Sequence, residues 1–260
     1  MDAAARFPVA FDAAALAAEV PTALGHVAQV REIWPEIDGW VNFPLFNRTG
    51  AADDLMLALY PGPAQPTPQA ATMPATAAVV RALMEAGFAV KQARIAVLAP
   101  GELLRCHVDM YPAARLIVPL NDQGDDFRHL FGEICVAMGA GELWGVAGDV
   151  CHGAAHVGQT GARVALLVDA DPEASSPPAW FGGPWRIPAE RMVDRRPLDA
   201  VERARLDAGD IEAGWLRAPF ELAITAEEAY AGLVAACERR GLLDRAGHWR
   251  RHACVCVPEG

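Results

Sequence analysis

Five short apolar segments follow one another in the middle of the chain, and they limit the possible fold more than any other feature. They are residues 93–99, 114–120, 133–138, 142–147 and 162–169 (ARIAVLA, ARLIVPL, EICVAM, ELWGVA and ARVALLVD). Turn-forming stretches such as APGE, NDQGDD and HVGQTG separate them. Short strands at such spacing are typical of a sandwich or a barrel. We therefore expect a mainly β core between about residues 93 and 169.

Helical segments flank this region on both sides. Apolar residues at helical spacing predict helices at 11–24, 74–88, 198–216 and 225–243. Gly87 is a stop signal near the end of the second segment. Thr225, with Glu228 three residues later, predicts a capping box at the start of the fourth. The Pro- and Gly-rich stretch 175–185 reads as a linker.

These patterns predict a mainly β core, either a sandwich or a barrel, with flanking helices. We expect residues 1–170 to form one domain with N-terminal helices, and residues 171–260 to form a C-terminal helical region packed on it. Residues 60–74 contain five prolines and must form an ordered loop or a lid.

Composition excludes several classes of protein. The net charge of -11 and the lack of any long Lys/Arg block argue against a nucleic-acid-binding protein. There is no run of eighteen apolar residues and no recognisable signal peptide, so we expect a cytoplasmic protein with no membrane partner. The six cysteines are then reduced thiols. Cys254 and Cys256 form a CxC without a second pair, which argues against a structural zinc site.

A histidine and an aspartate, His107 and Asp109, stand two residues apart in a strand-like stretch. On a strand their side chains point to one face. With a third ligand, either His152 or His156, they would form the two-histidine, one-carboxylate group that is diagnostic of non-heme iron(II) oxygenases. A surface histidine followed by a turn aspartate would give the same short pattern.

Two arginines stand at the beginnings of apolar segments. Arg115 begins the strand after the His-x-Asp pair, and Arg163 begins the last strand, eleven residues past His152. An arginine at the mouth of an apolar strand is suited to bind a carboxylate in a bidentate manner. Each could also be a strand-end arginine with its charged group in water.

Several motifs together resemble the aspartyl/asparaginyl β-hydroxylase superfamily, and within it the bacterial proline 3-hydroxylases. A Pro-Gly pair at 100–101 precedes His107 by seven and six residues, and an arginine opens the next strand. The GE-x-W motif at 141–144 has a histidine eleven residues past its glycine. Upstream, GWVNFPLFNRTG (39–50) and PAQPT (63–67) resemble the N-terminal part of the proline hydroxylases.

The resemblance implies a double-stranded β-helix with an iron site. His107, Asp109 and His152 would hold Fe(II), the GE-x-W spacing selecting His152 over His156, which then falls in a surface turn. Arg163 would bind the distal carboxylate of 2-oxoglutarate, and Arg115 a carboxylate of 2-oxoglutarate or of the substrate. The chain departs from the family at Ile117, where a histidine is common, and in an interval from His152 to Arg163 that is one residue longer.

The implied activity is that of an Fe(II)/2-oxoglutarate-dependent dioxygenase, which uses dioxygen to hydroxylate an unactivated carbon and releases succinate. We expect a small substrate, a free amino acid or a derivative resembling proline, with Arg94 and Arg115 near its carboxylate. Alternatives are a peptidyl aspartyl/asparaginyl β-hydroxylase, a jelly-roll metal enzyme without 2-oxoglutarate chemistry, and a non-catalytic jelly-roll domain. The remaining histidines are expected to be structural or on the surface: His26, His129, His248 and His252.

Overall fold

The computed structural model describes residues 2–33, 40–54, 60–109, 114–122, 124–211 and 213–256, with the backbone alone at 31–33, 213–214 and 251–256. Its strands are β1 (Ala4–Ala10), β2 (Val41–Asn47), β3 (Gln65–Pro66), β4 (Ala89–Leu98), β5 (Leu103–His107), β6 (Ala114–Pro119), β7 (Phe127–Phe131), β8 (Ile134–Ala137), β9 (Glu142–Val146), β10 (His152–His156) and β11 (Arg163–Asp171). They form a seven-stranded sheet, β1-β9-β6-β11-β4-β2-β3, and a four-stranded sheet, β5-β10-β7-β8. Neighbouring strands are antiparallel in both sheets.

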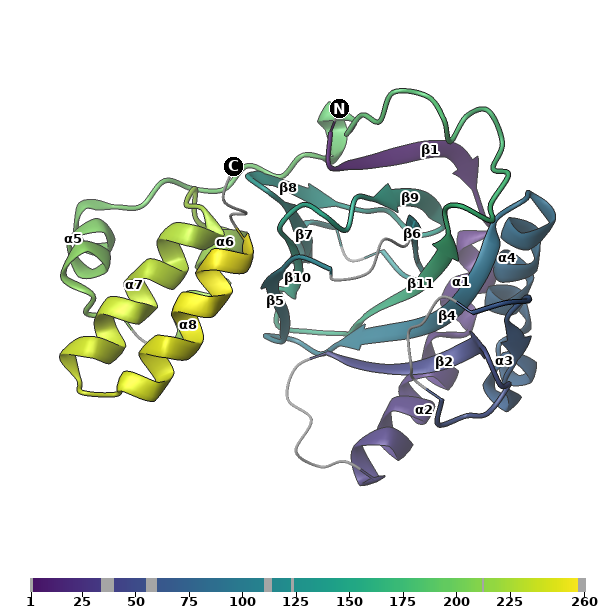
Figure 1. Ribbon diagram of the computed structural model, residues 1–260, viewed down its shortest axis with the longest axis horizontal. Coiled ribbons are helices and arrows are strands. Elements are labelled where there is room, and N and C mark those ends of the chain that lie inside the picture. The colour runs from purple at the N-terminus through teal and green to yellow at the C-terminus, as the bar shows by residue number, and fades with distance from the viewer. Residues whose placement is uncertain are drawn as a thin grey trace.

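The two sheets form a double-stranded β-helix, as predicted, with helices on both sides (Figure 1). The helices are α1 (Ala13–Ala18), α2 (Val20–Ile33), α3 (Pro68–Thr72), α4 (Pro74–Glu85), α5 (Ala200–Ala208), α6 (Ala218–Glu221), α7 (Ala226–Arg239) and α8 (Leu243–Cys256), with 3-10 turns at Gly124–Asp126, Ala189–Arg191 and Ala213–Arg217. Helices α1 to α4 cover the outer side of the seven-stranded sheet, and α6 and α8 contact the four-stranded sheet. None of the helices in the described ranges is long and apolar enough to cross a bilayer.

Side chains along the central strand β11 alternate between the two faces of the seven-stranded sheet, and this determines which of them face the interior. Val164, Leu166 and Val168 pack with the helices α1 to α4 in one apolar cluster. The intervening residues point the other way, towards the four-stranded sheet, because successive side chains of a strand point to opposite faces. The same alternation applies to β4 and β6, so the predicted arginines of the three strands share the inner face of the core.

The C-terminal helices pack against the strand that carries His107. The Tyr230 hydroxyl on α7 donates a hydrogen bond of 2.8 Å to the carbonyl of Cys106 on β5. The guanidinium of Arg105 lies 5.6 Å from the ring centre of Trp249 on α8. A buried apolar cluster that includes Leu130, Phe220 and Tyr230 fills the space between the helices and the sheet. The C-terminal region thus supports the four-stranded sheet at the strand that carries His107.

Several predicted boundaries differ from the structure. The expected helix 11–24 is two helices, which meet at Glu19. The expected helix 198–216 ends at Gly209, whose positive φ of 57° caps α5 in the left-handed region. The capping box of Thr225 and Glu228 is confirmed at the start of α7. The division of the chain at residue 170 stays a prediction.

The proline-rich segment 60–74 is ordered but packs along the sheet edge. It contains β3 and α3, and β3 pairs with β2. The Thr67 hydroxyl donates to the carbonyl of Pro44 at 2.8 Å, and Lys91 Nζ donates to the carbonyl of Tyr60 at 2.7 Å. None of its residues is among those that line the cavity described below. These contacts give it the role of an ordered loop, and they do not place it over the site as a lid.

Candidate active site

His107 and His152 face each other as a cross-strand pair on β5 and β10. Their ring centres are 4.5 Å apart. The Nδ1 atom of His107 lies 2.7 Å from the carbonyl oxygen of Arg105, and that of His152 lies 2.8 Å from the carbonyl oxygen of Val150. A carbonyl oxygen only accepts, so each Nδ1 carries a hydrogen and each Nε2 keeps its lone pair. Both Nε2 atoms are thereby prepared to bind a metal ion.

Asp109 completes the group from just beyond the end of β5. Its amide donates to the carbonyl of Gly148 at 2.8 Å. Oδ1 lies 3.6 Å from His107 Nε2, and Oδ2 lies 3.5 Å from His152 Nε2. The prediction placed both members of the His-x-Asp pair on one strand, but only His107 is in the strand, and Asp109 reaches the histidines from two residues beyond its end.

The three side chains fit a divalent metal ion. One ligand atom from each of His107, Asp109 and His152 can be chosen so that all lie within 4.8 Å of one another. Among the described residues, the buried His152 Nε2 has no hydrogen-bond partner, which is costly unless something binds there. Two imidazoles and one carboxylate are the donor set of non-heme iron(II) oxygenases, and they leave three coordination positions open.

His156 does not belong to this group. It is the last residue of β10 and is fully buried, so the expectation that it lies in a surface turn is wrong. Its Nε2 lies 3.1 Å from the carbonyl of Thr160, and its Nδ1 accepts from the amide of Gly158 at 3.2 Å. Both ring nitrogens are therefore used within the β10–β11 connection.

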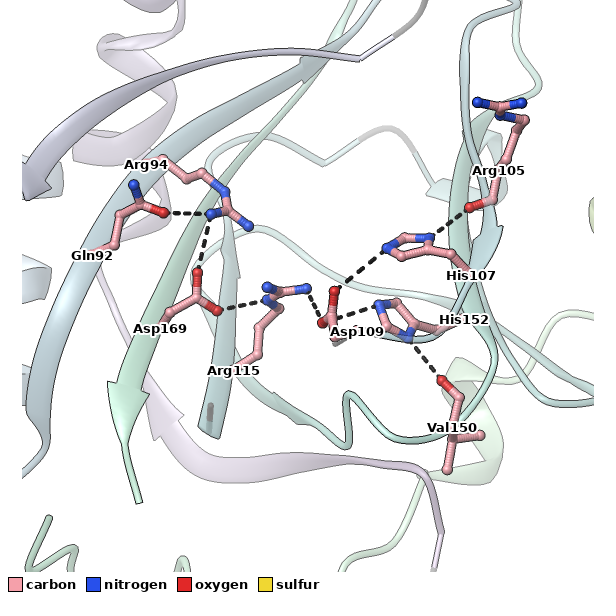
Figure 2. Close-up of polar contacts among 9 residues, drawn as sticks. All are labelled: Gln92, Arg94, Arg105, His107, Asp109, Arg115, Val150, His152 and Asp169. Atoms are coloured by element: carbon pink, nitrogen blue, oxygen red, sulfur yellow. Dashed lines mark hydrogen bonds and ion pairs between the residues drawn. The ribbon is translucent and has the colours of Figure 1, made fainter. Parts of the chain in front are cut away.

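Asp109 is held from the opposite sheet by Arg115. The Nη1 of Arg115 on β6 donates to Asp109 Oδ2, and its Nε donates to Asp169 Oδ1 at 2.8 Å (Figure 2). Burial raises the pKa of Asp109, but His107 and the charge of Arg115 outweigh this and hold that pKa below its usual range. The carboxylate is therefore ionised at neutral pH, as a metal ligand must be.

Asp169 on β11 also pairs with a second arginine. The Nη1 of Arg94 on β4 lies 3.2 Å from Asp169 Oδ2 and donates to Gln92 Oε1 at 2.5 Å. A row of polar side chains thus runs from Gln92 through Arg94, Asp169 and Arg115 to Asp109 (Figure 2).

Arg163 lies in the same cavity without an acidic partner. The cavity is lined by polar residues of both sheets, including Arg115, His152 and Arg163, and by apolar walls such as Ile117 and Phe131. Within the described ranges Arg163 forms no ion pair, and burial lowers the pKa of its guanidinium to about 10. A buried guanidinium that is still charged at neutral pH is a strong site for a carboxylate.

His129 is a cavity residue that the sequence interpretation missed. It lies on β7, and its Nε2 accepts a hydrogen bond from Arg163 Nη2. Burial, reinforced by the charge of Arg163, holds the pKa of His129 well below its usual range, so the ring is neutral. Only the pairing of β7 with β10, which sets His129 opposite Ala154, reveals this position. No local motif marks it.

Because His152 is buried, we expect the folded protein to lose stability as the pH falls. Burial, followed by the neighbouring His107, lowers the pKa of His152 to about 4, against about 6.5 in an unfolded chain. The unfolded state therefore binds the proton first as the pH falls, and the folded state loses about 2 kcal/mol between pH 7 and pH 5. We expect urea denaturation in the presence of a chelator to show this loss of stability. The His152→Asn variant should lack the part of the loss that comes from His152. An unchanged pH dependence in the variant would contradict the assignment.

Comparison with known proteins agrees with this geometry. The family model described as Aspartyl/Asparaginyl beta-hydroxylase matches residues 12–172, which is more than half of the chain. No curated protein matches the chain.

Solved structures with a similar fold share little sequence with the chain. HygX from Streptomyces hygroscopicus with nickel and 2-oxoglutarate bound is 10% identical with a TM-score of 0.40, covering 66% of this chain and 83% of HygX. AviO1 from Streptomyces viridochromogenes Tue57 is 14% identical with a TM-score of 0.40, covering 68% and 93%. A non-heme monooxygenase, the ThoJ–Ni complex, is 16% identical with a TM-score of 0.41, covering 93% and 96%.

The family match covers β2 to β11 and therefore the three residues of the candidate metal site, His107, Asp109 and His152. Its extent, and a His/Asp/His group at the expected motif, identify the chain as an enzyme of the dioxygenase class. The chain belongs to the aspartyl/asparaginyl beta-hydroxylase family.

Proposed function

We propose that the protein is an Fe(II)/2-oxoglutarate-dependent dioxygenase that hydroxylates an unactivated carbon of a small, proline-like amino acid or derivative. His107, Asp109 and His152 are the proposed iron ligands. The observation that carries the proposal is the convergence of their ligand atoms within 4.8 Å, with each Nδ1 directed to a backbone carbonyl. The proposal includes a cytoplasmic location.

Iron(II) with 2-oxoglutarate and dioxygen supplies the oxidising chemistry, in which the keto-acid is decarboxylated to succinate while one oxygen atom enters the substrate. The protein contributes the ligand geometry and the binding of the keto-acid. Arg163 is proposed to pair with the far carboxylate of 2-oxoglutarate, and its ring partner His129 keeps the guanidinium oriented. Apolar side chains such as Ile117 and Phe131 limit water in the cavity.

The end of 2-oxoglutarate that lies next to the metal is held without the histidine that is common in the family. Ile117 occupies that position and lines the cavity with an apolar side chain. Arg115 lines the same cavity and stays the predicted contact for a carboxylate of 2-oxoglutarate or of the substrate. Its two ion pairs with Asp109 and Asp169 leave it less free for this role than Arg163.

The position of the cavity supports a free amino acid over a folded protein domain. The cavity lies between the two sheets, and its lining, which includes Arg115, Phe131 and Arg163, comes from both of them. Small-molecule sites enclose most of their ligand. A site set between two sheets therefore supports a small substrate over a peptide.

Succinate release tests the proposal. Purified protein with Fe(II), ascorbate and 2-oxoglutarate is incubated with each free amino acid and with Asp- or Asn-containing peptides. We expect succinate formation to depend on Fe(II) and to rise with one or more free amino acids. Stimulation by peptides alone would instead favour a peptidyl aspartyl/asparaginyl hydroxylase, and metal binding without any succinate would favour a jelly-roll protein without 2-oxoglutarate chemistry.

A further inference from the structure

Two positions on the inner face of the seven-stranded sheet carry more positive charge than the chain itself balances. The first is Arg163, which lacks any ion pair within the described ranges. The second is the pair Arg94 and Arg115, which share the single carboxylate of Asp169. Asp109 also contacts Arg115, but its charge is needed for the metal ion. A buried cation without a full counter-charge is unfavourable in a ligand-free protein and marks a place where an anion binds.

Within the pair, Arg94 is the arginine that lacks compensation. Arg115 is the closer partner of the shared carboxylate, since its Nε lies 2.8 Å from Asp169 Oδ1, and it also contacts Asp109. Arg94 Nη1 lies 3.2 Å from Asp169 Oδ2, and this is the one ion pair that Arg94 forms among the described residues. The unmet charge therefore lies on Arg94.

Unused hydrogen-bond donors gather at the same place. Arg94 Nε, Gln92 Nε2 and Trp40 Nε1 are buried and have no hydrogen-bond partner in the part of the chain that the structure describes. Gln92 and Arg94 are two residues apart on β4 and so share its inner face. The oxygen of Gln92 accepts from Arg94, which leaves the amide nitrogen as the free group. The guanidinium of Arg94 lies 5.8 Å from the ring centre of Trp40, which also lines the cavity that holds His152 and Arg163.

We propose that Arg94, Gln92 and Trp40 form the binding site for a carboxylate group of the substrate, separate from the site of 2-oxoglutarate at Arg163. The substrate class is then a small carboxylic acid that presents its anionic group to β4. The inference rests on the proposed function and assigns two residues, Gln92 and Trp40, to which the sequence interpretation gave no role. Asp169 acts as a positioning residue, because it orients Arg94 by an ion pair of 3.2 Å.

The position of Arg94 distinguishes this site from the one that holds the carboxylate of 2-oxoglutarate next to the metal. A keto-acid bound to the metal must keep its near carboxylate next to His107, Asp109 and His152. Between those ligands and Arg94 lie Asp169 and Arg115, as Figure 2 shows. A second anion is therefore needed at Arg94, and in a two-substrate enzyme this anion is the substrate that is oxidised.

Matched variants at the two arginines test the assignment. Arg94→Met and Arg163→Met each remove one buried cation from the same sheet, and Arg94→Lys keeps the charge but loses the planar fork. Binding of 2-oxoglutarate to Ni(II)-loaded protein is measured by calorimetry. Succinate formation is measured with Fe(II) and a panel that begins with L-proline and L-prolinamide and continues through the free amino acids and their amides.

We expect Arg94→Met to keep the 2-oxoglutarate affinity within about twofold and to lose stimulation by the acids at least tenfold. Arg163→Met should show the opposite pattern: here it is the binding of 2-oxoglutarate that is weakened, at least tenfold. Gln92→Leu should raise the KM of a stimulating acid and leave 2-oxoglutarate binding unchanged. In wild-type protein the free acids should stimulate and their amides should not.

Four outcomes overturn the inference. They are equal stimulation by acids and amides, stimulation only by compounds without a carboxylate, unchanged stimulation in Arg94→Met, and a loss of 2-oxoglutarate affinity in Arg94→Met as large as in Arg163→Met. In each of these cases succinate is still formed by the wild-type protein, so the dioxygenase assignment survives. Absence of Fe(II)-dependent succinate with every compound would reject the proposed function itself, and the substrate site with it.

Discussion

Replacement of Asp109 by alanine is expected to abolish succinate formation and to weaken the binding of a divalent metal ion by about 100-fold or more. The carboxylate is the only acidic member of the three-residue group, and its Oδ1 and Oδ2 each face one histidine Nε2. Its loss leaves the two imidazoles and the positive charge of Arg115 beside the metal position. Calorimetric titration of the metal-free protein with Ni(II), which avoids oxidation, measures the change.

His156→Gln is the matched control for this experiment. His156 lies on the same strand as His152 and is equally buried, but its ring nitrogens face Thr160 and Gly158. We expect this variant to bind Ni(II) within about twofold of the wild type, whatever it loses in thermal stability. A loss of metal affinity in His156→Gln comparable to that in Asp109→Ala would show that the wrong histidine has been assigned.

The second large effect is expected at Arg163. Arg163→Met should raise the concentration of 2-oxoglutarate that is needed for half-maximal succinate formation by an order of magnitude or more, because a charge-assisted pair contributes roughly 1.5–3 kcal/mol. The guanidinium is buried, lies beside His129 and has no acidic partner among the described residues, so no described carboxylate can take the place of the proposed 2-oxoglutarate.

Metal binding separates a specific loss from misfolding in this variant. Arg163→Met should bind Ni(II) as tightly as the wild type, because residue 163 does not contact the three ligands. An unchanged requirement for 2-oxoglutarate would move the carboxylate contact to Arg115, the other arginine of the cavity.

Much of the β core could be predicted because its strands are short, apolar and bounded by turn residues. The strands β1 and β2 were missed for a physical reason: each contains a proline, Pro8 and Pro44, and proline argues against a central strand. The structure accommodates them because β1 is an edge strand and the register of β2 against β4 shifts after Pro44. The helix α8 lacked the capping signals that identified α7.

The site was predictable where a motif fixes the spacing along the chain. The GE-x-W motif leads through β9 to His152, which the structure places opposite His107. Partners that come together only by strand pairing could not be found in this way. Asp169 ends an apolar run and reads as an ordinary strand-end carboxylate, yet its register sets it between Arg115 and Gln92 in the interior.

The two sheets contribute different residues to the site, and this bears on how such enzymes acquire new substrates. The histidines come from the four-stranded sheet, and the backbone carbonyl two residues earlier in the chain orients each ring. The arginines come from the seven-stranded sheet. Residues of the seven-stranded sheet such as Gln92 and Arg94 can therefore change during evolution to accommodate a new substrate. The two histidines, whose rings are oriented by the main chain, need not change with them. Directed evolution of this protein toward new substrates is best confined to the inner face of β4.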